Sequence, residues 1–243
     1  MPVVAASSPT DCFDAAYLAC KIALEHMTPV VLLTDAYIAN GSAAWRLPDL
    51  NTYPSICPPY VKPEMADSWT PFQRDPQTGV RYWATPGTPG FMHRIGGLEK
   101  SNETGAISTE PENHFLMTKL RAEKVEKIAD SLPPLTVEGN PDADLLIVGF
   151  GGTYGHLHSA MDQLNAMGKK AALAHFRVIN PLPKNTAEVL RKYKTIVVAE
   201  QNMGQLVGYL RMKVEGIRLH QFNQVKGQPF VVKELVEAFS QLF

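Results

Sequence analysis

The stretch TIVVAEQNMGQL, residues 195–206, indicates the fold class of this chain most clearly. An apolar run rich in β-branched residues is followed by a short polar turn, and Gly204 then opens a helical pattern. This order repeats from Asp144 onward. Strands are expected at 145–148, 171–176, 195–199 and 217–221, with helices at 155–167, 184–192, 204–213 and 231–243. Strands that alternate with helices of about ten residues predict a doubly wound, mainly parallel α/β sheet.

Residues 1–44 predict a single β-α-β unit. Strands at 3–6 and 29–34 flank a helix that begins near Ser8, with Asp11 placed to complete a capping box. The second strand is apolar without alternation, as in a parallel sheet covered on both faces. A unit of this size buries too little surface to stand alone, so we expect residues 1–44 to be the C-terminal part of a larger α/β domain.

Residues 45–139 have a different character, with many prolines and aromatic residues and no sustained helical or strand period. A connection this long without regular structure is uncommon and usually functional, and its aromatic content predicts that it wraps another surface. One helix is expected at 111–131. The side chains expected to face inward on it are Phe115, Leu116, Leu120, Val125 and Ile128. The predicted organisation is therefore 1–44, a connector at 45–139, and a complete α/β domain at 140–243.

Composition excludes several classes of function. The 243 residues are 45% hydrophobic and carry a net charge of −1, which indicates a globular protein without affinity for nucleic acid. No apolar run reaches the roughly 18–20 residues of a membrane helix. No signal peptide is visible, and Cys12 and Cys20 lie roughly 12 Å apart along a predicted helix, too far for a disulfide bond. We therefore expect a reduced, cytoplasmic protein that is not bound to a membrane.

The sequence GFGGTYG, residues 149–155, follows a strand and opens a helix, which is the context of a dinucleotide-binding fingerprint. Its glycine spacing departs from that fingerprint, because Tyr154 stands at the third glycine position. One interpretation is that Gly151, Gly152 and Thr153 hold an anion or a cofactor phosphate at the helix N-terminus. The other, which the spacing favours, is a tight turn that requires glycine for steric reasons.

Three residues of 195–206 are candidates for contact with substrate or with another subunit: Glu200, Asn202 and Gln205. They follow a strand at the carboxyl edge of the sheet, where open α/β folds place their ligands. The favoured alternative is that Asn202 or Gln205 caps the following helix and that Glu200 meets a subunit partner.

The glycine-rich loop 84–105 supplies three further candidates of the same kind, Arg94, Glu99 and Lys100. A loop with an arginine and a lysine could close over a dicarboxylate substrate or coenzyme A. A solvated surface loop is an equally good interpretation.

The chain lacks the motifs of most catalytic centres. There is no HExxH, no paired CxxC, no phosphate-binding loop of the GxxxxGK[ST] type and no GxSxG. We therefore assign no catalytic residue and no metal ligand to it.

Several segments, in their order and spacing, resemble the α subunit of 2-oxoacid:ferredoxin oxidoreductases. They are GGLEKSNETG at 96–105, INPLP at 179–183 and TIVVAEQNMGQL at 195–206. Residues 7–45 resemble the end of the family's thiamine pyrimidine-binding-type domain, and DADLLIVGFGGTYG, residues 142–155, begins what looks like a transketolase C-terminal-type domain. Lys100 stands where many relatives carry histidine, which favours the 2-oxoglutarate-type branch with fused γ and α regions.

The resemblance implies that the chain is the C-terminal portion of an α subunit. The complete enzyme, a heterodimer with a β subunit, would decarboxylate a 2-oxoacid oxidatively on thiamine diphosphate, form an acyl-coenzyme A and reduce ferredoxin. The thiamine-activating glutamate lies upstream of Met1 in the family, and the β subunit supplies the magnesium site, through a Gly-Asp-Gly motif, and the iron–sulfur cluster. No Gly-Asp-Gly occurs here. The resemblance thus predicts a scaffold and subunit interface that binds no cofactor and is inactive alone, and that could form a homodimer through uncovered strand edges.

Two other functions stay open from the sequence. One is a nucleotide- or coenzyme A-binding regulatory module that uses the turn 149–155. The other is a complete small transketolase-like enzyme, which the absent diphosphate motif disfavours.

Overall fold

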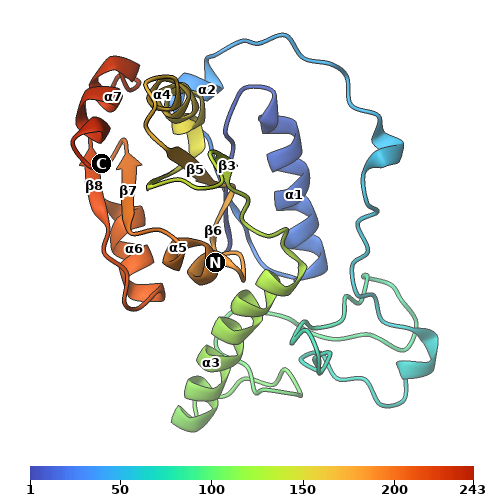
Figure 1. The fold of residues 1–243 in the computed structure, drawn as a ribbon. Coiled ribbons are helices and arrows are strands. Elements are labelled where there is room, and N and C mark those ends of the chain that lie inside the picture. Colours follow the sequence, from blue (N-terminus) through green and yellow to red (C-terminus); the bar gives the residue numbers. More distant parts are fainter. The chain divides into compact units, whose positions relative to one another are not determined.

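The computed structural model describes residues 1–243 and divides by internal contacts into two compact units. The first, here the connector unit, comprises Met1–Pro2, Leu18–Val30 and Leu47–Ser131. The second, here the sheet unit, comprises Val3–Tyr17, Val31–Arg46 and Leu132–Phe243. The chain is coloured from blue to red along its sequence in Figure 1.

The sheet unit contains a five-stranded sheet in the order β3-β5-β4-β7-β8. Its strands are β3 (Glu138–Gly139), β4 (Leu145–Phe150), β5 (Ala171–Phe176), β7 (Thr195–Glu200) and β8 (His220–Asn223). The strands β5, β4, β7 and β8 run parallel, and the short β3 pairs antiparallel with β5. The expected mainly parallel α/β sheet is confirmed.

Helices cover both faces of this sheet, because alternate residues of its apolar strands point to opposite sides. Leu146 and Val148 of β4 pack with α5 (Thr186–Arg191) and α6 (Gln205–Lys213). Their neighbours Leu145 and Ile147 pack on the other side with α4 (Tyr154–Ala166) and α7 (Val232–Ser240). Figure 1 shows this three-layer, doubly wound arrangement.

A second sheet of three strands joins the start of the chain to the later domain, in the order β2-β1-β6. The strands β1 (Val3–Ala5) and β2 (Val31–Leu33) are parallel, as the β-α-β interpretation predicts. On its other edge β1 pairs antiparallel with β6 (Val178–Asn180). The strand β6 was not expected from the sequence, and it provides a neighbour for β1 from a distant part of the chain.

The predicted start of the first helix, α1 (Asp11–Glu25), is confirmed in its main features. The backbone N–H of Asp11 donates to the hydroxyl of Ser8 at 3.1 Å, and the Asp11 carboxylate accepts from the N–H of Ser7 at 2.9 Å. The guanidinium of Arg177 also pairs with Asp11. A short helix, α2 (Ala36–Ala39), follows β2 and is capped by Asp35.

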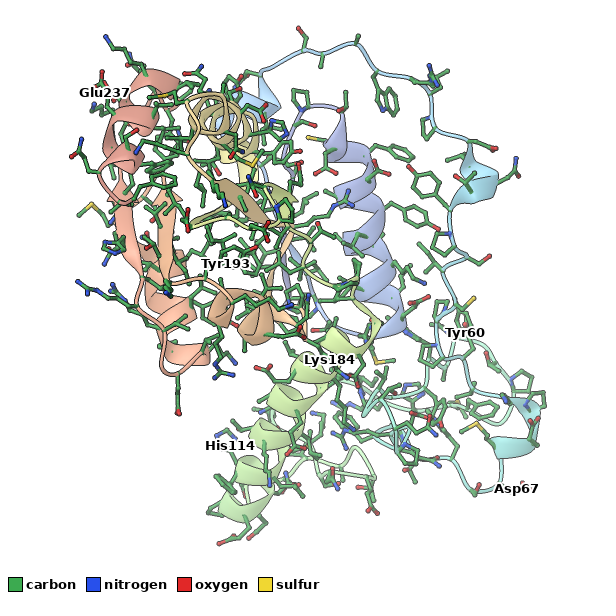
Figure 2. The ribbon with its side chains drawn as sticks, in the orientation of Figure 1. Tyr60, Asp67, His114, Lys184, Tyr193 and Glu237 are labelled. Carbon is green, nitrogen blue, oxygen red and sulfur yellow. The ribbon has the colours of Figure 1, made fainter.

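The connector unit has little regular structure apart from α3 (Pro111–Lys127), which continues as the 3₁₀ turn η3 (Ile128–Ser131). Two further 3₁₀ turns occur, η1 (Leu50–Thr52) and η2 (Pro63–Met65). Isolated β-bridges link Tyr60 to Trp83, Arg74 to Arg81 and Lys100 to Ile107. Figure 2 draws the side chains of this irregular chain, with Tyr60 and His114 labelled.

The predicted inward face of α3 is partly wrong. Ile128 is buried, but Phe115 is 73% exposed and Leu116 is 40% exposed, and the buried residue in this stretch is Met117. Apolar spacing alone predicts which side chains of α3 could face inward, but too few elements pack on α3 within this chain to cover all of its apolar side chains.

Candidate functional site

The first candidate site lies where the strand order of the five-stranded sheet reverses. From β4 the chain moves outward to β5, and it then returns to the other side of β4 as β7. Ligands of open α/β sheets bind at such a switch point, outside the carboxyl ends of the strands. A cavity of about 240 Å³ lies there, between the ends of β4, β7 and β2. Its lining residues, here the switch-point site, are Leu33, Thr34, Asp35, Phe150, Gly151, Gly152, Thr153, Gln201 and Asn202.

The carboxylate of Asp35 ties two helix starts together at the switch-point site. Its Oδ1 accepts from the N–H of Ile38 at 2.8 Å and so caps α2. Its Oδ2 accepts from the N–H of Gly152 at 3.1 Å, just ahead of α4. A helix N-terminus attracts anions through its free N–H groups, and here the anion is a side chain of the protein itself.

This contact explains the glycine at position 152. A Cβ atom there would lie 2.0 Å from Oδ2 of Asp35, far inside van der Waals contact. Gly151 has a positive φ of 62°, which favours glycine independently. The three residues predicted to hold a phosphate all line the cavity: Gly151, Gly152 and Thr153. The N–H of Gly152, however, already donates to Asp35 and is not free to bind a phosphate.

Thr153 and His175 are two neighbouring polar residues at this turn. The Thr153 hydroxyl donates to the carbonyl of Phe150 at 2.7 Å and lies 3.5 Å from Nε2 of His175. The His175 ring packs edge-on against Tyr154, with 5.1 Å between ring centroids. Burial lowers the pKa of His175 to about 4, so the imidazole is neutral near pH 7.

Glu200, at the end of β7, is fully buried and caps α6. Its two carboxylate oxygens accept from the N–H groups of Leu206 at 2.7 Å and Val207 at 2.9 Å. A carboxylate at a helix N-terminus is stabilised by the helix dipole and satisfies N–H groups that have no partner within the helix. Both oxygens are therefore used inside the sheet unit.

Asn202 also serves the start of α6. Its Oδ1 accepts from the N–H of Gly204 at 2.7 Å and from that of Gln205 at 3.1 Å. Asn202 lines the switch-point cavity as well, whereas the Gln205 side chain is exposed.

The remaining candidates, Arg94, Glu99 and Lys100, belong to the connector unit. The ammonium of Lys100, a residue that is only 6% exposed, donates to the carbonyls of Gly97 and Leu98 and so holds its own loop. Leu98 has a φ of 70°, a left-handed conformation that is costly for a branched side chain. The loop is thus tightly constrained, and the lysine is part of that constraint.

Glu99 bridges its loop to α3. One oxygen lies 2.6 Å from Nδ1 of His114 and the other accepts from Arg121 at 3.0 Å. The hydrogen bonds from Arg121 and then from His114 lower the pKa of Glu99. Arg94 is exposed and, together with Lys100, lines a cavity of about 630 Å³.

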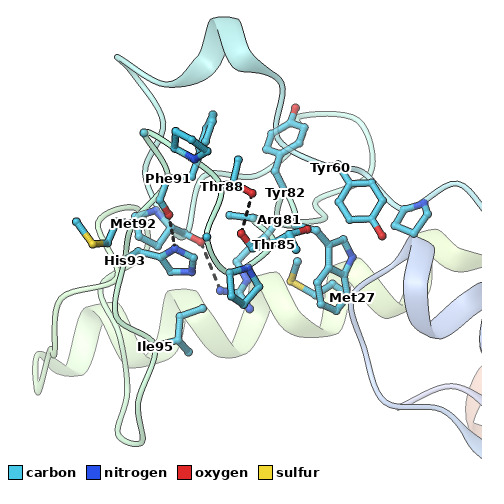
Figure 3. Close-up of a pocket in the computed structure, with 18 of the residues that line it drawn as sticks. Met27, Tyr60, Arg81, Tyr82, Thr85, Thr88, Phe91, Met92, His93 and Ile95 are labelled. Atoms are coloured by element: carbon cyan, nitrogen blue, oxygen red, sulfur yellow. Dashed lines mark hydrogen bonds between the residues drawn. The ribbon is translucent and has the colours of Figure 1, made fainter.

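A larger cavity of about 1020 Å³ lies in the same unit (Figure 3). Its walls include Tyr60, Arg81, Tyr82, Trp83 and His93. The aromatic content of the connector is visible in the sequence, but no periodic pattern surrounds Arg81 to indicate that it lines a cavity. This cavity, named here the connector cavity, is the largest of those described.

No three His, Cys, Asp or Glu side chains of the described residues converge closely enough to hold a metal ion. The three cysteines are not joined by disulfide bonds. No helix in the structure combines the length and apolar character needed to cross a membrane.

Two family models match the chain. The model of the thiamine diphosphate-binding region of pyruvate flavodoxin/ferredoxin oxidoreductase matches residues 1–112. That of pyruvate:ferredoxin oxidoreductase core domain II matches residues 143–235.

Relatives with curated names agree with these matches. The 2-oxoglutarate oxidoreductase subunit KorA of Mycobacterium tuberculosis is 44% identical over 234 residues, which are 96% of this chain and 35% of the relative. Subunit alpha of the 2-oxoacid:ferredoxin oxidoreductase 1 of Aeropyrum pernix is 27% identical, over 97% of this chain and 37% of the relative. The chain therefore spans little more than a third of the length of these relatives.

A solved structure gives the same answer for the fold. The 2-oxoglutarate:ferredoxin oxidoreductase from Magnetococcus marinus, with 2-oxoglutarate, coenzyme A and succinyl-CoA bound, superposes with a TM-score of 0.87 at 25% identity. The match covers 99% of this chain and 42% of that one.

Proposed function

This chain is homologous to a portion of the α subunit of 2-oxoacid:ferredoxin oxidoreductases, and we propose that it works as part of such an enzyme. The enzyme's reaction is the oxidative decarboxylation of 2-oxoglutarate to succinyl-coenzyme A, with transfer of two electrons to ferredoxin. Within it, residues 1–243 act as a scaffold and subunit interface in the cytoplasm. The carrying observation is the 44% identity, along 96% of the chain, to a subunit named for 2-oxoglutarate.

The proposal keeps the three-part division into 1–44, 45–139 and 140–243. The two family models end at residue 112 and begin at residue 143, which supports a boundary between them. The compact units cut across this division, because residues of β1 and β2 lie in the same unit as the five-stranded sheet. The first part is thus tied to the last by folding, in keeping with a scaffold.

The cofactors of the complete enzyme are thiamine diphosphate, which stabilises the carbanion left by decarboxylation, together with magnesium and an iron–sulfur cluster. No set of three His, Cys, Asp or Glu side chains converges to ligate magnesium or iron, and the N–H of Gly152 is already bonded to Asp35. We propose that other parts of the enzyme supply these sites.

Subunit contacts are the role that the exposed apolar side chains support. Phe115 is 73% exposed, Leu98 is 78% exposed and Ile107 is 59% exposed, all in the connector unit. Exposed apolar side chains of this size are candidates for burial against a partner protein. We propose that the β subunit of the oxidoreductase covers them. Arg94, Glu99 and Lys100 remain candidates for this interface, and Asn202 and Gln205 for contacts at the switch-point site.

The proposal can be tested with a chimera in which these residues replace the matching segment of the Mycobacterium tuberculosis relative. Co-expressed with the second subunit of that enzyme, the chimera should support 2-oxoglutarate- and coenzyme A-dependent reduction of ferredoxin. A matched chimera with Phe115→Ser and Ile107→Ser should show weaker association of the two subunits. A folded chimera that neither binds the second subunit nor turns over would contradict the proposal.

Calorimetry on the isolated chain provides an independent check. Thiamine diphosphate and magnesium, titrated together, should give no heat beyond that of dilution. Binding in the micromolar range would show that the chain holds the cofactor itself and is not a scaffold.

The alternative of a regulatory module that binds a nucleotide at the turn 149–155 is not favoured. The relatives are oxidoreductase subunits, and Asp35 occupies the helix N-terminus that such a phosphate would need.

A further inference from the structure

Three cationic side chains, Arg74, Arg81 and Lys124, form a cluster in the connector unit. Arg74 and Arg81 face each other across an antiparallel bridge that closes the turn at 75–80. Lys124 reaches the same region from α3, where its ammonium donates to the carbonyl of Met27 at 2.7 Å. Like charges directly opposite on paired strands are destabilising, so this placement calls for an explanation.

None of the three cations forms an ion pair. Arg74 donates to the backbone carbonyl and the side-chain oxygen of Asn102, at 2.8 and 2.6 Å, and to the carbonyl of Phe72. Arg81 lies over the Phe72 ring at 4.3 Å and makes a long hydrogen bond of 3.4 Å to the carbonyl of Pro71. All of these partners are neutral.

The nearest carboxylate in sequence is committed elsewhere. Asp75 accepts from the N–H groups of Gln77 and Thr78, at 3.1 and 2.8 Å, and so holds the turn. The electrostatic result is visible on α3, where burial, Arg81 and Arg74 together lower the pKa of Lys124 to about 8. A half-buried cluster of cations without a counter-ion is costly, and an anion bound nearby would remove that cost.

The connector cavity lies beside this cluster. Arg81 is one of its lining residues, and Met27, whose carbonyl accepts from Lys124, is another. Figure 3 draws Arg81 among aromatic and hydroxyl side chains, including Tyr60, Tyr82 and Thr85. The wall therefore offers a guanidinium together with flat aromatic faces.

The size of the cavity decides between classes of anion. Its volume of about 1020 Å³ is at the upper end of the range for sites that bind drug-sized ligands. Inorganic phosphate or a small dicarboxylate would leave most of it empty. A ligand with a phosphate for the guanidinium and a planar ring for the aromatic walls would use both features.

We propose that the connector cavity is a nucleotide-binding site, in which Arg81 contacts phosphate, Arg74 and Lys124 provide a positive potential, and an aromatic wall that includes Tyr60 stacks on the base. The inference rests on the proposed function in one respect, because coenzyme A, which that reaction consumes, is itself an adenine nucleotide; titration of the free chain with ADP needs neither the second subunit nor turnover, so the two proposals fail separately. The site is also separate from the turn 149–155.

The first test is isothermal titration of the full chain at low salt with ADP, adenosine and pyrophosphate. ADP is expected to bind at least tenfold more tightly than either fragment, since only ADP uses both the cation and the aromatic wall. No heat with ADP, or pyrophosphate binding as tightly as ADP, would overturn the proposal. Adenosine binding as tightly as ADP would overturn it too, because the cations would then have no role.

Substitutions test separately the contact of Arg81 with phosphate and the stacking of the aromatic wall on the base. Arg81→Gln should weaken ADP at least tenfold, and Tyr60→Ala should weaken ADP while leaving pyrophosphate binding unchanged. Lys62→Gln, which removes an exposed cation from the same connector, is the matched control and should bind ADP as the parent does. Circular dichroism on each variant establishes that the fold persists.

Should Arg81→Gln not fold, Arg74→Gln with a salt titration replaces it. The expected result is a smaller loss of ADP affinity and a shallower dependence of affinity on salt than in the parent chain. Equal ADP affinity and equal salt dependence in this variant and in the parent would overturn the assignment.

Discussion

Gly152 and Asp35 form a contact in which each residue determines what the other position can hold. The carboxylate sits 3.1 Å from the Gly152 nitrogen and also caps α2 through Ile38. Because it is fixed by two backbone N–H groups, it cannot simply rotate away from a new side chain. The space above Gly152 is therefore closed, although the residue lies beside a cavity.

We predict that Gly152→Ala lowers the free energy of unfolding by about 1–3 kcal/mol, the usual cost of overpacking. In an Asp35→Ala background the same substitution should cost much less, because the colliding oxygen is gone. Urea denaturation of the four proteins in this double-mutant cycle measures the coupling. An unchanged cost in the Asp35→Ala background would show that some other neighbour sets the requirement for glycine.

His175 makes stability depend on acid pH. Its pKa is about 4 in the folded protein, against an ordinary value of 6.5, so the unfolded chain binds the proton more readily between these values. Stability should therefore be full above pH 6.5 and fall as the pH drops toward 4, with a slope from this group of at most about 1.4 kcal/mol per pH unit.

The substitution His175→Gln, which cannot titrate, should flatten that part of the stability curve. Denaturant melts at intervals from pH 4 to 7.5 provide the comparison. Parallel curves for the two proteins would assign the acid sensitivity to other groups.

Among the elements, α6 is the one whose start is most heavily supported. A buried carboxylate, Glu200, and an amide side chain, Asn202, together occupy the N–H groups of its first turn. Glu200 is also the last residue of β7, so one residue joins a central strand to the helix that follows it.

We predict that Glu200→Ala costs about 3 kcal/mol or more, because two charge-assisted hydrogen bonds are lost and two buried N–H groups are left without a partner. Glu200→Gln keeps one acceptor and should cost less. Glu215→Ala, an exposed carboxylate that follows the same helix, is the control and should change stability by no more than about 0.5 kcal/mol. Equal thermal stability of Glu200→Ala and the control would contradict this account.

On α3, Lys124 should produce a pH dependence of the same sign in the alkaline range. Its pKa is about 8 when folded and 10.5 ordinarily, so below pH 8 its charge opposes folding in full, and this penalty disappears as the pH rises toward 10.5. The wild-type chain should therefore gain stability relative to Lys124→Met between pH 8 and 10.5. A constant difference across this range, measured by chemical denaturation, would mean that the lysine is not electrostatically strained.

Sequence patterns predicted elements where local signals were sufficient. The strand β5 was expected at 171–176 and is found there, because an apolar run is bounded by a glycine turn and two lysines. The strand β6 was missed because three residues carry no period, and what makes them a strand is pairing with β1 far away in the sequence.

At the candidate site, too, local sequence signals are informative, whereas contacts between distant residues cannot be predicted. Sequence spacing favoured a steric reason for the glycines of 149–155, but it could not identify Asp35 as the neighbour, since 117 residues separate it from Gly152. No sequence pattern predicts that Arg74 and Arg81 are paired, because the turn between them is irregular, and only the structure brings them face to face.

For the whole molecule, the two units should differ in how long their backbone N–H groups resist exchange. The core of the sheet unit is built on buried parallel strands, whereas the connector unit is held by isolated bridges and a few buried side chains. Regions with few buried contacts open at low free energy.

We predict that hydrogen exchange followed by mass spectrometry protects β4, β5 and β7 most strongly and exchanges residues 47–110 at least a hundredfold faster in the isolated chain. Binding of the second oxidoreductase subunit should slow exchange in the connector selectively. Uniform protection across both units of the free chain would contradict this difference.

The pairing of β1 with β6 has a consequence for synthesis in the cell. The partner residues Val3 and Asn180 are far apart in the sequence, so β1 leaves the ribosome long before this neighbour is synthesised. At elongation rates of about 5–20 residues per second, the delay is on the order of 10–35 s. During that time one border of an apolar strand is open, and we expect nascent chains stalled before residue 178 to recruit chaperones more than those released after it.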